Sequence, residues 1–440
     1  MNIVLLSGGS GKRLWPLSND VRSKQFIRIF KTEDGGYESM LQRMYRGIRK
    51  VDGDAKVTIA TSKSQASAIN NQLDEAVDLS IEPCRRDTFP AIALACSFLH
   101  DVKGVGDDEP VVVCPVDPYV DDDYFRALSD LSDMAEKGDY NLNLMGIEPT
   151  YPSEKYGYII PKEAADVSEV LEFKEKPDVA TATSYIEKGA LWNGGVFAFK
   201  LKYLLGIARD ALGSDDYDRL YESYGSLPKI SFDYAVAEKE SSINVIRFGG
   251  EWKDLGTWNT LTEAMLEPVS GNAVCGLCEN TQVVNELGLP LIVLGINDAV
   301  VAATPDGILV SDKEASKQLK DYVEDQRPMY ERRQWGEYRV LDQKLHDDGQ
   351  NSLVKELIIS AGKNISYQRH ERRTEIWTIT EGSGRLVLDD VVTDVSRGMT
   401  IAIAPGVKHA IQATDELHII EVQMGDELVE DDIEHFEWEW

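Results

Sequence analysis

Short apolar runs alternate with segments of helical periodicity over the first part of the chain. Residues 3–6, 111–117 and 140–147 have the length and apolar content of buried strands, whereas residues 181–190 have the mixed pattern of a helix. Strands that alternate with helices favour an α/β fold with a mixed, mostly parallel sheet. We therefore predict one α/β domain over residues 1–265.

The pattern changes after residue 265. Residues 266–330 contain short β-like runs separated by Asn, Gly and Pro, and they end in a helical pattern at residues 313–326. This region predicts stacked short strands, like those of a left-handed β-helix, followed by a helical linker. Over residues 331–440, strands and turns that contain Gly or Asp recur at regular spacing. That spacing predicts a small β-barrel or jelly roll as a third domain.

Composition adds that the protein is strongly acidic. The 440 residues carry 76 acidic against 46 basic side chains, a net charge of −30, and no long basic stretch. Because nucleic-acid binding needs a basic surface that neutralises phosphates, we expect no nucleic-acid partner. A chain with few cations that handles phosphates has to concentrate those cations locally, so clusters of Lys and Arg are informative.

No segment suggests export or membrane insertion. The N-terminus lacks the basic start of a signal peptide, and no stretch reaches the roughly 20 apolar residues of a membrane span. The five cysteines are sparse and odd in number, as is typical of reduced thiols. We predict a cytoplasmic protein without a membrane partner.

A glycine-rich loop follows the first apolar run, where residues 7–13 read Ser-Gly-Gly-Ser-Gly-Lys-Arg. The P-loop spacing fails because its first glycine would be Leu6, and the dinucleotide-binding spacing fails because its third glycine would be Leu14. The loop still suits phosphate, since its backbone N–H groups can line one side of a triphosphate. Arg13 can neutralise a departing pyrophosphate, and Lys24 adds a second positive charge.

This loop is the first of several sequence blocks that occur together in one family. Over about 260 residues the chain resembles the mannose-1-phosphate guanylyltransferases, a group of sugar nucleotidyltransferases. In chain order the matching blocks are residues 6–18 and 24–26, Glu82–Thr88, Pro115–Asp117, Tyr156–Ile159, Phe173–Pro177, Leu191–Gly195, Phe232–Ala235 and Trp252–Trp258.

The resemblance implies a Rossmann-like domain that transfers a nucleotidyl group from GTP to mannose 1-phosphate and releases pyrophosphate, giving GDP-mannose. Such an in-line displacement depends on positioning and charge neutralisation and needs no covalent nucleophile. By resemblance, Asp117 and Asp254 meet at one Mg²⁺, an ion that prefers oxygen ligands. Two alternatives stay open: transfer to another hexose 1-phosphate or from another base, and a regulatory protein that binds sugar nucleotides without turnover.

The resemblance also implies roles for the other residues of this site. The residues expected to be catalytic are Arg13, Lys24 and Lys176. The residues expected to bind the nucleotide are Leu6, Gly8, Gly9, Ser10, Gly11, Lys12, Arg86 and Asp87. The residues expected to bind the sugar are Gly157, Glu175, Asn193 and Asp233. The family commonly has Asn in place of Asp87 and His in place of Pro118, and both differences bear on nucleotide preference and rate.

Residues 334–440 resemble the cupin domain of the bifunctional members of this family, which also carry a phosphomannose isomerase. Gln368 and His370 are two residues apart and therefore share one face of a strand. Glu375 begins the next strand, and His409 comes from a later one. The resemblance implies that these four side chains hold Zn²⁺ or another divalent ion, which could polarise a sugar carbonyl during isomerisation.

The match is incomplete around these four positions. The family commonly has His where this chain has Glu371, Arg372 and Ile376, and Arg where it has Lys408. A lysine cannot hold a phosphate bidentately as an arginine does. Two interpretations of the barrel therefore stay open, a weak mannose-6-phosphate isomerase and a structural or dimerising domain. We also expect the chain to form a homo-oligomer, as a dimer.

Overall fold

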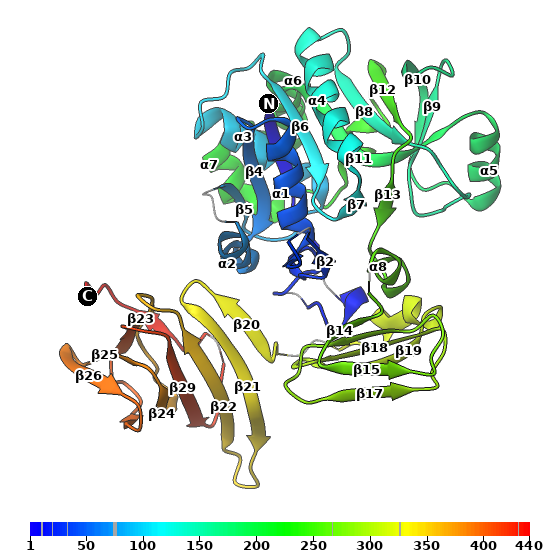
Figure 1. Cartoon of the computed structure of the whole chain (residues 1–440). Helices are drawn as coiled ribbons and strands as arrows, with labels where there is room; N and C mark the ends of the chain where they lie inside the picture. The colour runs from blue at the N-terminus through cyan, green and yellow to red at the C-terminus, as the bar shows by residue number, and fades with distance from the viewer. Residues whose placement is uncertain are drawn as a thin grey trace. The chain divides into compact units, whose positions relative to one another are not determined.

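A computed structural model of the chain describes residues 1–9, 12–19, 21–32, 34–73, 77–265, 267–324, 327–429 and 431–440. The chain forms two compact units (Figure 1). The first unit holds Met1–Leu14 and Ser23–Glu267, and the second holds Trp15–Arg22 and Pro268–Trp440. A short piece of the N-terminal segment thus belongs to the unit that the C-terminal part of the chain forms.

A nine-stranded mixed sheet runs through the first unit, in the order β5-β4-β1-β6-β11-β8-β12-β10-β9 (Figure 1). Its strands are β1 (Asn2–Leu6), β4 (Lys56–Ser62), β5 (Asp78–Glu82), β6 (Pro110–Pro115), β8 (Leu142–Ile147), β9 (Tyr158–Pro161), β10 (Val167–Lys174), β11 (Leu191–Lys200) and β12 (Ile243–Phe248). The predicted mixed sheet is confirmed. Parallel pairing is confined to β5-β4-β1-β6 and to β8 with β12, because β11 lies between β6 and β8 and runs antiparallel to both.

Helices cover both faces of this sheet. They are α1 (Met40–Val51), α2 (Lys63–Gln72), α3 (Thr88–Asp101), α4 (Asp122–Lys137), α5 (Val179–Glu187), α6 (Leu201–Leu212), α7 (Tyr217–Ser223) and α8 (Trp258–Ala264). Strand β1 shows how the two cores form, since successive side chains of a strand point to opposite faces. Ile3 and Leu5 pack into one core with α1 and α4, while Val4 packs into the other with α3 and α6.

Short elements between these strands carry part of the site described below. They are η1 (Lys12–Leu14), η2 (Lys24–Phe26), β2 (Phe30–Lys31), β3 (Tyr37–Glu38), β7 (Pro118–Val120), η3 (Tyr224–Ser226), η4 (Asp233–Ala237) and β13 (Trp252–Asp254). The other residues of the site lie in loops and in β6 and β11. Among the described residues, no helix has both the length and the apolar character needed to cross a membrane.

Short strands stack after Pro268 in the second unit, and all of them pair in parallel except the last, which runs antiparallel to its neighbour. They are β14 (Val269–Gly271), β15 (Ala273–Gly276), β16 (Gln282–Asn285), β17 (Leu291–Leu294), β18 (Ala299–Thr304) and β19 (Gly307–Asp312). Strands β14, β16 and β18 pair in parallel, as do β15 and β17, which is the arrangement of a small β-helix. The helical prediction covered residues 313–326, whereas among the described residues 313–324 the helix is the 3₁₀ helix η5 (Ala315–Asp321). Within η5 only Ser316 is buried, so the stretch has little packing to stabilise a longer helix.

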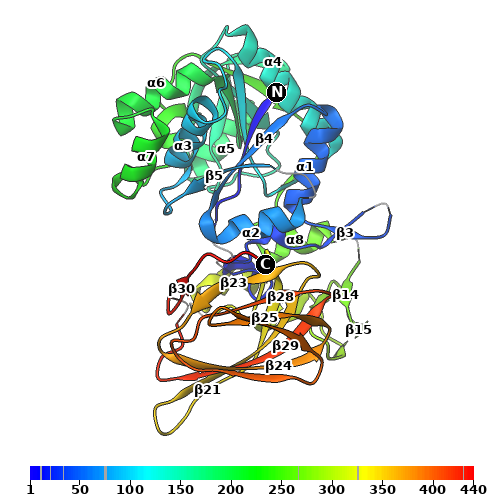
Figure 2. The same ribbon diagram turned by 90° about the vertical axis from the view of Figure 1, so that its left-hand side faces the viewer.

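Two antiparallel sheets form the barrel of the second unit (Figure 2). The six-stranded sheet consists of β20 (Tyr330–Arg333), β21 (Gly336–Leu345), β22 (Asn351–Ile359), β29 (Leu417–Gly425), β24 (Arg373–Glu381) and β27 (Thr400–Ile403). The five-stranded sheet consists of β26 (Val391–Ser396), β25 (Ser383–Leu388), β28 (His409–Ala413), β23 (Asn364–Arg369) and β30 (Glu434–His435). Their facing side chains form one apolar core, which includes Leu353, Trp377 and Ile411.

A register shift in β23 decides which side chains of that strand face the core. The pairing with β28 shifts between Ile365 and Gln368. Ile365 packs into the core, whereas Tyr367 packs with Val387 outside it, although the two residues are an even number apart. An irregularity of this kind turns the rest of a strand over. It leaves Gln368 on the interior face, beside His370.

Candidate functional site

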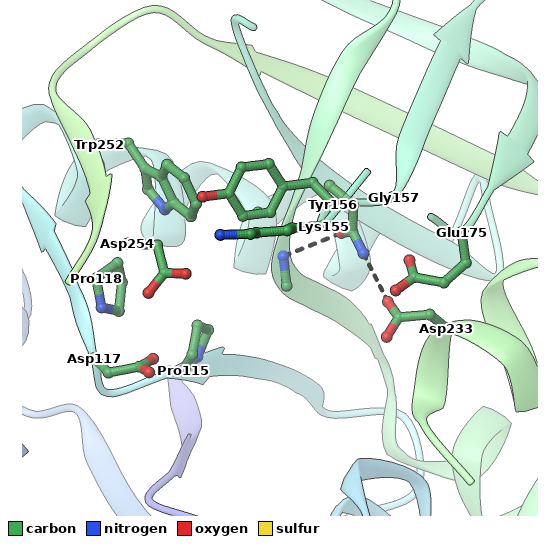
Figure 3. A pocket seen from close by; sticks show the side chains of 13 residues that line it. Pro115, Asp117, Pro118, Lys155, Tyr156, Gly157, Glu175, Asp233, Trp252 and Asp254 are labelled. Atoms are coloured by element: carbon green, nitrogen blue, oxygen red, sulfur yellow. Dashed lines mark hydrogen bonds between the residues drawn. The ribbon is translucent and has the colours of Figure 1, made fainter. Parts of the chain in front are cut away.

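A cavity of about 230 Å³ opens in the first unit at the ends of its strands (Figure 3). Its lining residues are Pro115, Asp117, Pro118, Lys155, Tyr156, Gly157, Glu175, Asn193, Gly194, Gly195, Asp233, Trp252 and Asp254. Figure 3 shows Asp117 and Asp254 together in one part of the cavity and Glu175 with Asp233 in another. Two acidic groupings therefore face one space.

The pairing of β7 with β13 brings Asp117 and Asp254 together, because Asp254 lies opposite Pro118. Lys24 bridges them, with its Nζ 2.6 Å from Asp117 Oδ2 and 3.7 Å from Asp254 Oδ1. Burial by itself would lower the pKa of Lys24, but the two carboxylates raise it above its ordinary value. Two carboxylates that share one cation and remain about one third exposed fit a Mg²⁺ site, since this ion accepts oxygen ligands and keeps several waters.

The other part of the cavity is a network of oxygen and amide groups. Asn193 Nδ2 donates to Asp233 Oδ1 at 2.6 Å, and the Asn193 backbone N–H donates to the Gly157 carbonyl at 2.8 Å. A Cβ on Gly157 would stand 2.4 Å from Glu175 Oε2, so a side chain there would force this carboxylate to move. Glu175 Oε2 is itself buried and has no hydrogen-bond partner among the described residues. It is therefore an acceptor that a ligand hydroxyl can use.

Both acids of this network have a raised pKa. Burial raises the pKa of Glu175, and the nearby charge of Asp233 adds to that shift, while Lys176 opposes it. Burial also raises the pKa of Asp233, against the hydrogen bond from Asn193. Acids that are held partly away from water and close to one another bind neutral hydroxyl groups well, because the hydroxyl replaces the water that they have lost.

Lys176 adopts a backbone conformation that is rare for lysine. Its φ is +46°, in the left-handed region, and its Nζ lies 2.5 Å from Glu175 Oε1. Burial would lower the pKa of Lys176, but the hydrogen bond and the charge of Glu175 raise it. A strained backbone of this kind costs about 1 kcal/mol and persists where the surrounding structure requires it. Lys176 is thus a fixed cation beside the polar network.

Aromatic side chains line the cavity as well. The rings of Tyr156 and Trp192 lie 4.9 Å apart, and those of Tyr156 and Trp252 lie 5.6 Å apart. Lys155 lines the same space. Tyr156 and Trp252 stand in blocks that match the family, but no role was predicted for them, and Lys155 was not predicted as a site residue. Lys155 and Tyr156 directly precede Gly157, and Trp252 lies two residues before Asp254. This closeness to predicted site residues is the signal that could have identified them.

The glycine-rich loop leaves β1 at its carboxyl end, directly after Leu6. Gly8 and Gly9 have open space around the Cα, and Gly9 has a φ of +139°. Arg85 stands in the block Glu82–Thr88, although no role was predicted for it, and it donates from Nη2 to the Gly9 carbonyl at 3.3 Å. The predicted nucleotide-binding residues Ser10 and Gly11 lie outside the described residues.

The cations that follow this loop lie at the carboxylate end of the site. Lys12 and Arg13 begin η1, and the charge of Arg13 lowers the pKa of Lys24, so their positive charges interact. Arg86 and Asp87 begin the next segment that the sequence predicts for the nucleotide. Arg86 donates to the Tyr224 carbonyl at 3.4 Å, and Asp87 accepts from the Thr88 N–H at 2.8 Å at the start of α3.

A second cluster of ligand atoms lies inside the barrel. His370, Glu375 and His409 are all buried, and their ligand atoms lie within 4.8 Å of one another. Glu375 Oε1 is 3.4 Å from His370 Nε2, and Glu375 Oε2 is 3.4 Å from His409 Nε2. Gln368 Nε2 lies 3.3 Å from His370 Nε2, so the four residues that the sequence singled out are neighbours.

The hydrogen bonds around this cluster leave two of its atoms available to a cation. Nδ1 of His370 lies 2.5 Å from the Asp432 carbonyl, and Nδ1 of His409 lies 3.1 Å from the Val407 carbonyl. Each Nδ1 therefore carries the proton, and each Nε2 presents a lone pair. His409 Nε2 and Glu375 Oε2 are buried without a hydrogen-bond partner among the described residues. Such a donor set fits a divalent ion of the kind that imidazole and carboxylate bind.

Buried charges surround the cluster. Arg373 lies 2.9 Å from Glu375 Oε1 and 3.1 Å from His370 Nε2. Although burial would raise it, the pKa of Glu375 falls to about 2 because His409, His370 and Arg373 beside it favour the carboxylate. Glu421 accepts from Trp377 Nε1 at 3.1 Å, and burial together with the charge of Glu375 raises its pKa to about 7. The barrel interior thus holds more polar groups than a packing core requires.

Three positions of the barrel that differ from the resembled family, Lys408, Arg372 and Glu371, have side chains that do not join the ligand cluster. Lys408 places its Nζ 4.2 Å from the centre of the Phe436 ring. Arg372 forms an ion pair with Glu427, and Glu371 is exposed. These side chains are therefore occupied outside the ligand cluster.

Comparisons with known proteins agree over both units. The profile of the nucleotidyl transferase family matches residues 2–269, and that of the mannose-6-phosphate isomerase C-terminal family matches residues 320–438. The xanthan biosynthesis protein XanB of Xanthomonas campestris pv. campestris is 31% identical, over 99% of this chain and 97% of that protein. The mannose-1-phosphate guanylyltransferase of Escherichia coli K12 is 30% identical, over 98% of this chain and 97% of that protein. A crystal structure of a mannose-1-phosphate geranyltransferase from Thermus thermophilus has a TM-score of 0.62 and 31% identity, covering 73% of this chain and 97% of that one.

Proposed function

Since the chain belongs to the mannose-1-phosphate guanylyltransferase family, we propose that its first unit transfers the guanylyl group of GTP to mannose 1-phosphate and releases pyrophosphate. The observation that carries this proposal is the single cavity with two differently built parts. One part joins Asp117 and Asp254 to Lys24, which suits a phosphate chain and its cation. The other joins Glu175, Asn193 and Asp233, which suits sugar hydroxyls.

The phosphate end acts by charge. A phosphate oxygen of the sugar phosphate forms a bond to the α-phosphorus of GTP, the bond to the β-phosphate breaks, and the electron pair leaves with pyrophosphate. Arg13 and Lys24 neutralise the charge that develops on this leaving group, in the manner of preorganised cations. Asp117 and Asp254 would hold Mg²⁺. When bound, such an ion would neutralise negative charge on the phosphates.

The sugar end acts by orientation. Glu175 Oε2 can accept a hydrogen bond from a sugar hydroxyl, and Asn193, held by Asp233, presents an amide to the same ligand. The absence of a Cβ at Gly157 keeps the approach to Glu175 short. Lys176 is placed to contact the sugar phosphate, because its Nζ lies beside this network. Fixing both reactants in one cavity converts a bimolecular reaction into an effectively unimolecular one.

A substrate panel tests this proposal. Mannose 1-phosphate is supplied with Mg²⁺ and, in turn, with each nucleoside triphosphate, and pyrophosphate release is followed. We expect turnover with GTP above that with the other triphosphates. Turnover with another triphosphate or another hexose 1-phosphate alone would change the base or the sugar, whereas tight GTP binding without any turnover would favour a regulatory protein.

A second function is supported by the barrel. The orphaned Nε2 of His409 and Oε2 of Glu375 favour a bound divalent ion, with Gln368 and His370 as further ligands. When bound, such an ion polarises a carbonyl, which is the chemistry that mannose-6-phosphate isomerisation requires. Formation of fructose 6-phosphate from mannose 6-phosphate, with and without added Zn²⁺ or Mn²⁺, separates a weak isomerase from a structural barrel.

The expected homo-oligomer has its best support in the β-helix. Val274, Ile292 and Leu294 on β15 and β17 are each more than half exposed. Apolar side chains that gather on one face often mark a contact with another protein. Light scattering over a range of concentrations tests for a dimer. A cytoplasmic location also remains a prediction, in keeping with five free cysteines.

A further inference from the structure

The segment Trp15–Arg22, which connects the phosphate-loop cations to Lys24, is built into the β-helix of the second unit. Arg13 and Leu14 precede it, and Lys24 follows two residues after its end. The chain therefore leaves the first unit directly after one expected catalytic cation and returns directly before another. Contacts that hold this segment therefore also restrict the positions of the residues at its two ends.

The turn between β18 and β19 holds the first half of the segment. Thr304 Oγ1 donates to the Pro16 carbonyl at 3.0 Å. A Cβ on Gly307 would stand 2.4 Å from the Trp15 ring, so the indole lies directly on this glycine, whose φ is +152°. Asn19 Nδ2 donates to Asp306 Oδ2 at 2.8 Å.

Asp306 is fixed from its other side. Its Oδ1 accepts from the Met329 backbone N–H at 2.6 Å, and its own N–H donates to Thr304 Oγ1 at 3.1 Å. Asn19 in turn accepts from the backbone N–H groups of Val21 and Arg22 at 2.9 and 2.6 Å. One carboxylate thus holds an asparagine that shapes the rest of the segment.

Arg22 closes the segment with a bidentate ion pair. Its Nη1 lies 2.6 Å from Glu286 Oε2, and its Nη2 lies 2.7 Å from Glu286 Oε1. The Tyr330 ring lies 6.0 Å from the guanidinium carbon. A fork-to-fork pair fixes direction as well as distance, which a single hydrogen bond does not. Arg22, the last residue of the segment, therefore has one well-defined position.

We propose that Glu286 and Asp306 are positioning residues for the nucleotidyl transfer, acting through Arg22 and Asn19 on the distance between Arg13 and Lys24. The inference rests on the proposed function. Neither acid touches the lining of the cavity, yet both hold the connection between the two cations. Transition-state stabilisation by preorganised charges depends steeply on their placement, and a displacement of 1 Å can cost about 100-fold.

The variants Glu286→Gln and Asp306→Asn test the proposal, because they keep shape and remove charge. We expect kcat to fall about ten- to a hundredfold in each, while KM for mannose 1-phosphate stays within about twofold, since Glu175 and Asp233 are untouched. Asp298→Asn is the matched control. Asp298 also accepts from an asparagine amide on the β-helix, Asn280 Nδ2 at 2.8 Å, but that pair has no link to the phosphate loop.

Hydrogen exchange separates this proposal from the proposed function. Amides of residues 15–22 should exchange faster in Glu286→Gln than in the parent, with the exchange of β1 and β6 unchanged. If the parent protein shows no turnover, the proposed function fails, and faster exchange in residues 15–22 still supports the anchoring. Unchanged exchange in this segment overturns the proposal. A uniform loss of protection over the whole chain, or a kcat equal to that of Asp298→Asn, overturns it as well.

Discussion

Both polar sites of the molecule combine carboxylates with cationic groups, yet they differ in exposure. In the first unit, the side chains of Asp117 and Asp254 are 34% and 37% exposed and share the ammonium of Lys24. In the barrel, the side chains of Glu375 and His409 are 2% and 1% exposed, and two of their atoms have no hydrogen-bond partner among the described residues. The first arrangement can exchange a cation together with its phosphate ligands. The second is suited to retaining one.

The difference shows that ligand atoms alone do not define a site. Carboxylates that reach water can trade one cation for another at small cost, whereas a buried carboxylate without a partner raises the free energy of the fold until something binds it. Function in the first unit should therefore respond to substitution by losing rate. The barrel should respond by losing affinity for an ion and the stability linked to it.

The largest effect is expected from Asp254→Asn. Removing one carboxylate from the pair that shares Lys24 should lower turnover about a thousandfold. The proposed Mg²⁺ site would lose one of its ligands, and the charge of the transition state would be less well stabilised. GTP should still bind, since Arg13 and the glycine-rich loop remain. Pyrophosphate release and equilibrium GTP binding measure the two properties separately.

Glu251→Gln serves as the control for this change. Glu251 forms a surface ion pair with Lys253, the residue directly before Asp254. The substitution Glu251→Gln should leave turnover unchanged. Equal turnover in Asp254→Asn and the parent protein would show that the exposed carboxylate pair does not serve the transfer.

The next effect concerns the barrel. After removal of bound ions, Zn²⁺ at about 100 times its dissociation constant should stabilise the protein by roughly 3 kcal/mol, because only the folded cluster presents all of its ligands. His409→Gln should abolish most of this gain, as read from thermal unfolding and from bound metal. His418→Gln, on β29 and paired with Glu416, is the control. The same Zn²⁺-dependent gain in both variants would contradict a metal centre in the barrel.

A smaller effect is expected from Gly157→Ala. The added Cβ would stand 2.4 Å from Glu175 Oε2, so the carboxylate has to move away from the sugar. KM for mannose 1-phosphate should rise about tenfold, or about 1.4 kcal/mol, with kcat less affected. Gly206→Ala in α6 has open space around its Cβ and should change neither constant. An unaltered KM in Gly157→Ala would remove Glu175 from the sugar site.

The smallest effect is a dependence of stability on pH. Burial raises the folded pKa of Glu175, so its contribution to stability is greatest below about pH 4.5 and is lost as the pH rises through the folded value. Glu175→Gln should therefore raise the free energy of unfolding by roughly 1 kcal/mol at pH 7 and by less at pH 4. Denaturant unfolding at the two pH values measures this. The exposed Glu163, replaced by Gln, should show no such difference, and an equal gain at both pH values would refute the burial argument.

The sequence predicted the alternating strands and helices well, because each carries its own periodicity. The continuous apolar run at residues 3–6 predicted the buried strand β1, whose Val4 and Leu5 pack into opposite cores. The stacked short strands and the barrel were also found from their turns and spacing. The helical prediction for residues 313–326 was too long for the described residues. A helical pattern alone does not stabilise a helix, and η5, in which Ser316 is the buried residue, is short.

The candidate site was predictable only where residues stood in recognisable blocks. Asp117 and Asp254 lie far apart in the chain, and their meeting depends on the pairing of β7 with β13, which no local pattern encodes. No role was predicted for Arg85, although it stands in the block Glu82–Thr88, or for Lys155, because the sequence does not show which cations face the cavity or its loop. The sequence also did not predict that Trp15–Arg22 belongs to the second unit. This membership rests on contacts with Glu286 and Asp306, which lie far away in the chain.

The anchoring of Trp15–Arg22 also bears on how the protein is made. On the ribosome, Arg22 is synthesised 264 residues before Glu286, and Asn19 is synthesised 287 residues before Asp306. At typical elongation rates the delay is about 15 to 60 seconds. The nascent sheet can therefore form early, while the connection between Arg13 and Lys24 waits for its last partners. A prematurely terminated chain would lack these anchors, so nucleotide chemistry is tied to completion of translation beyond residue 306.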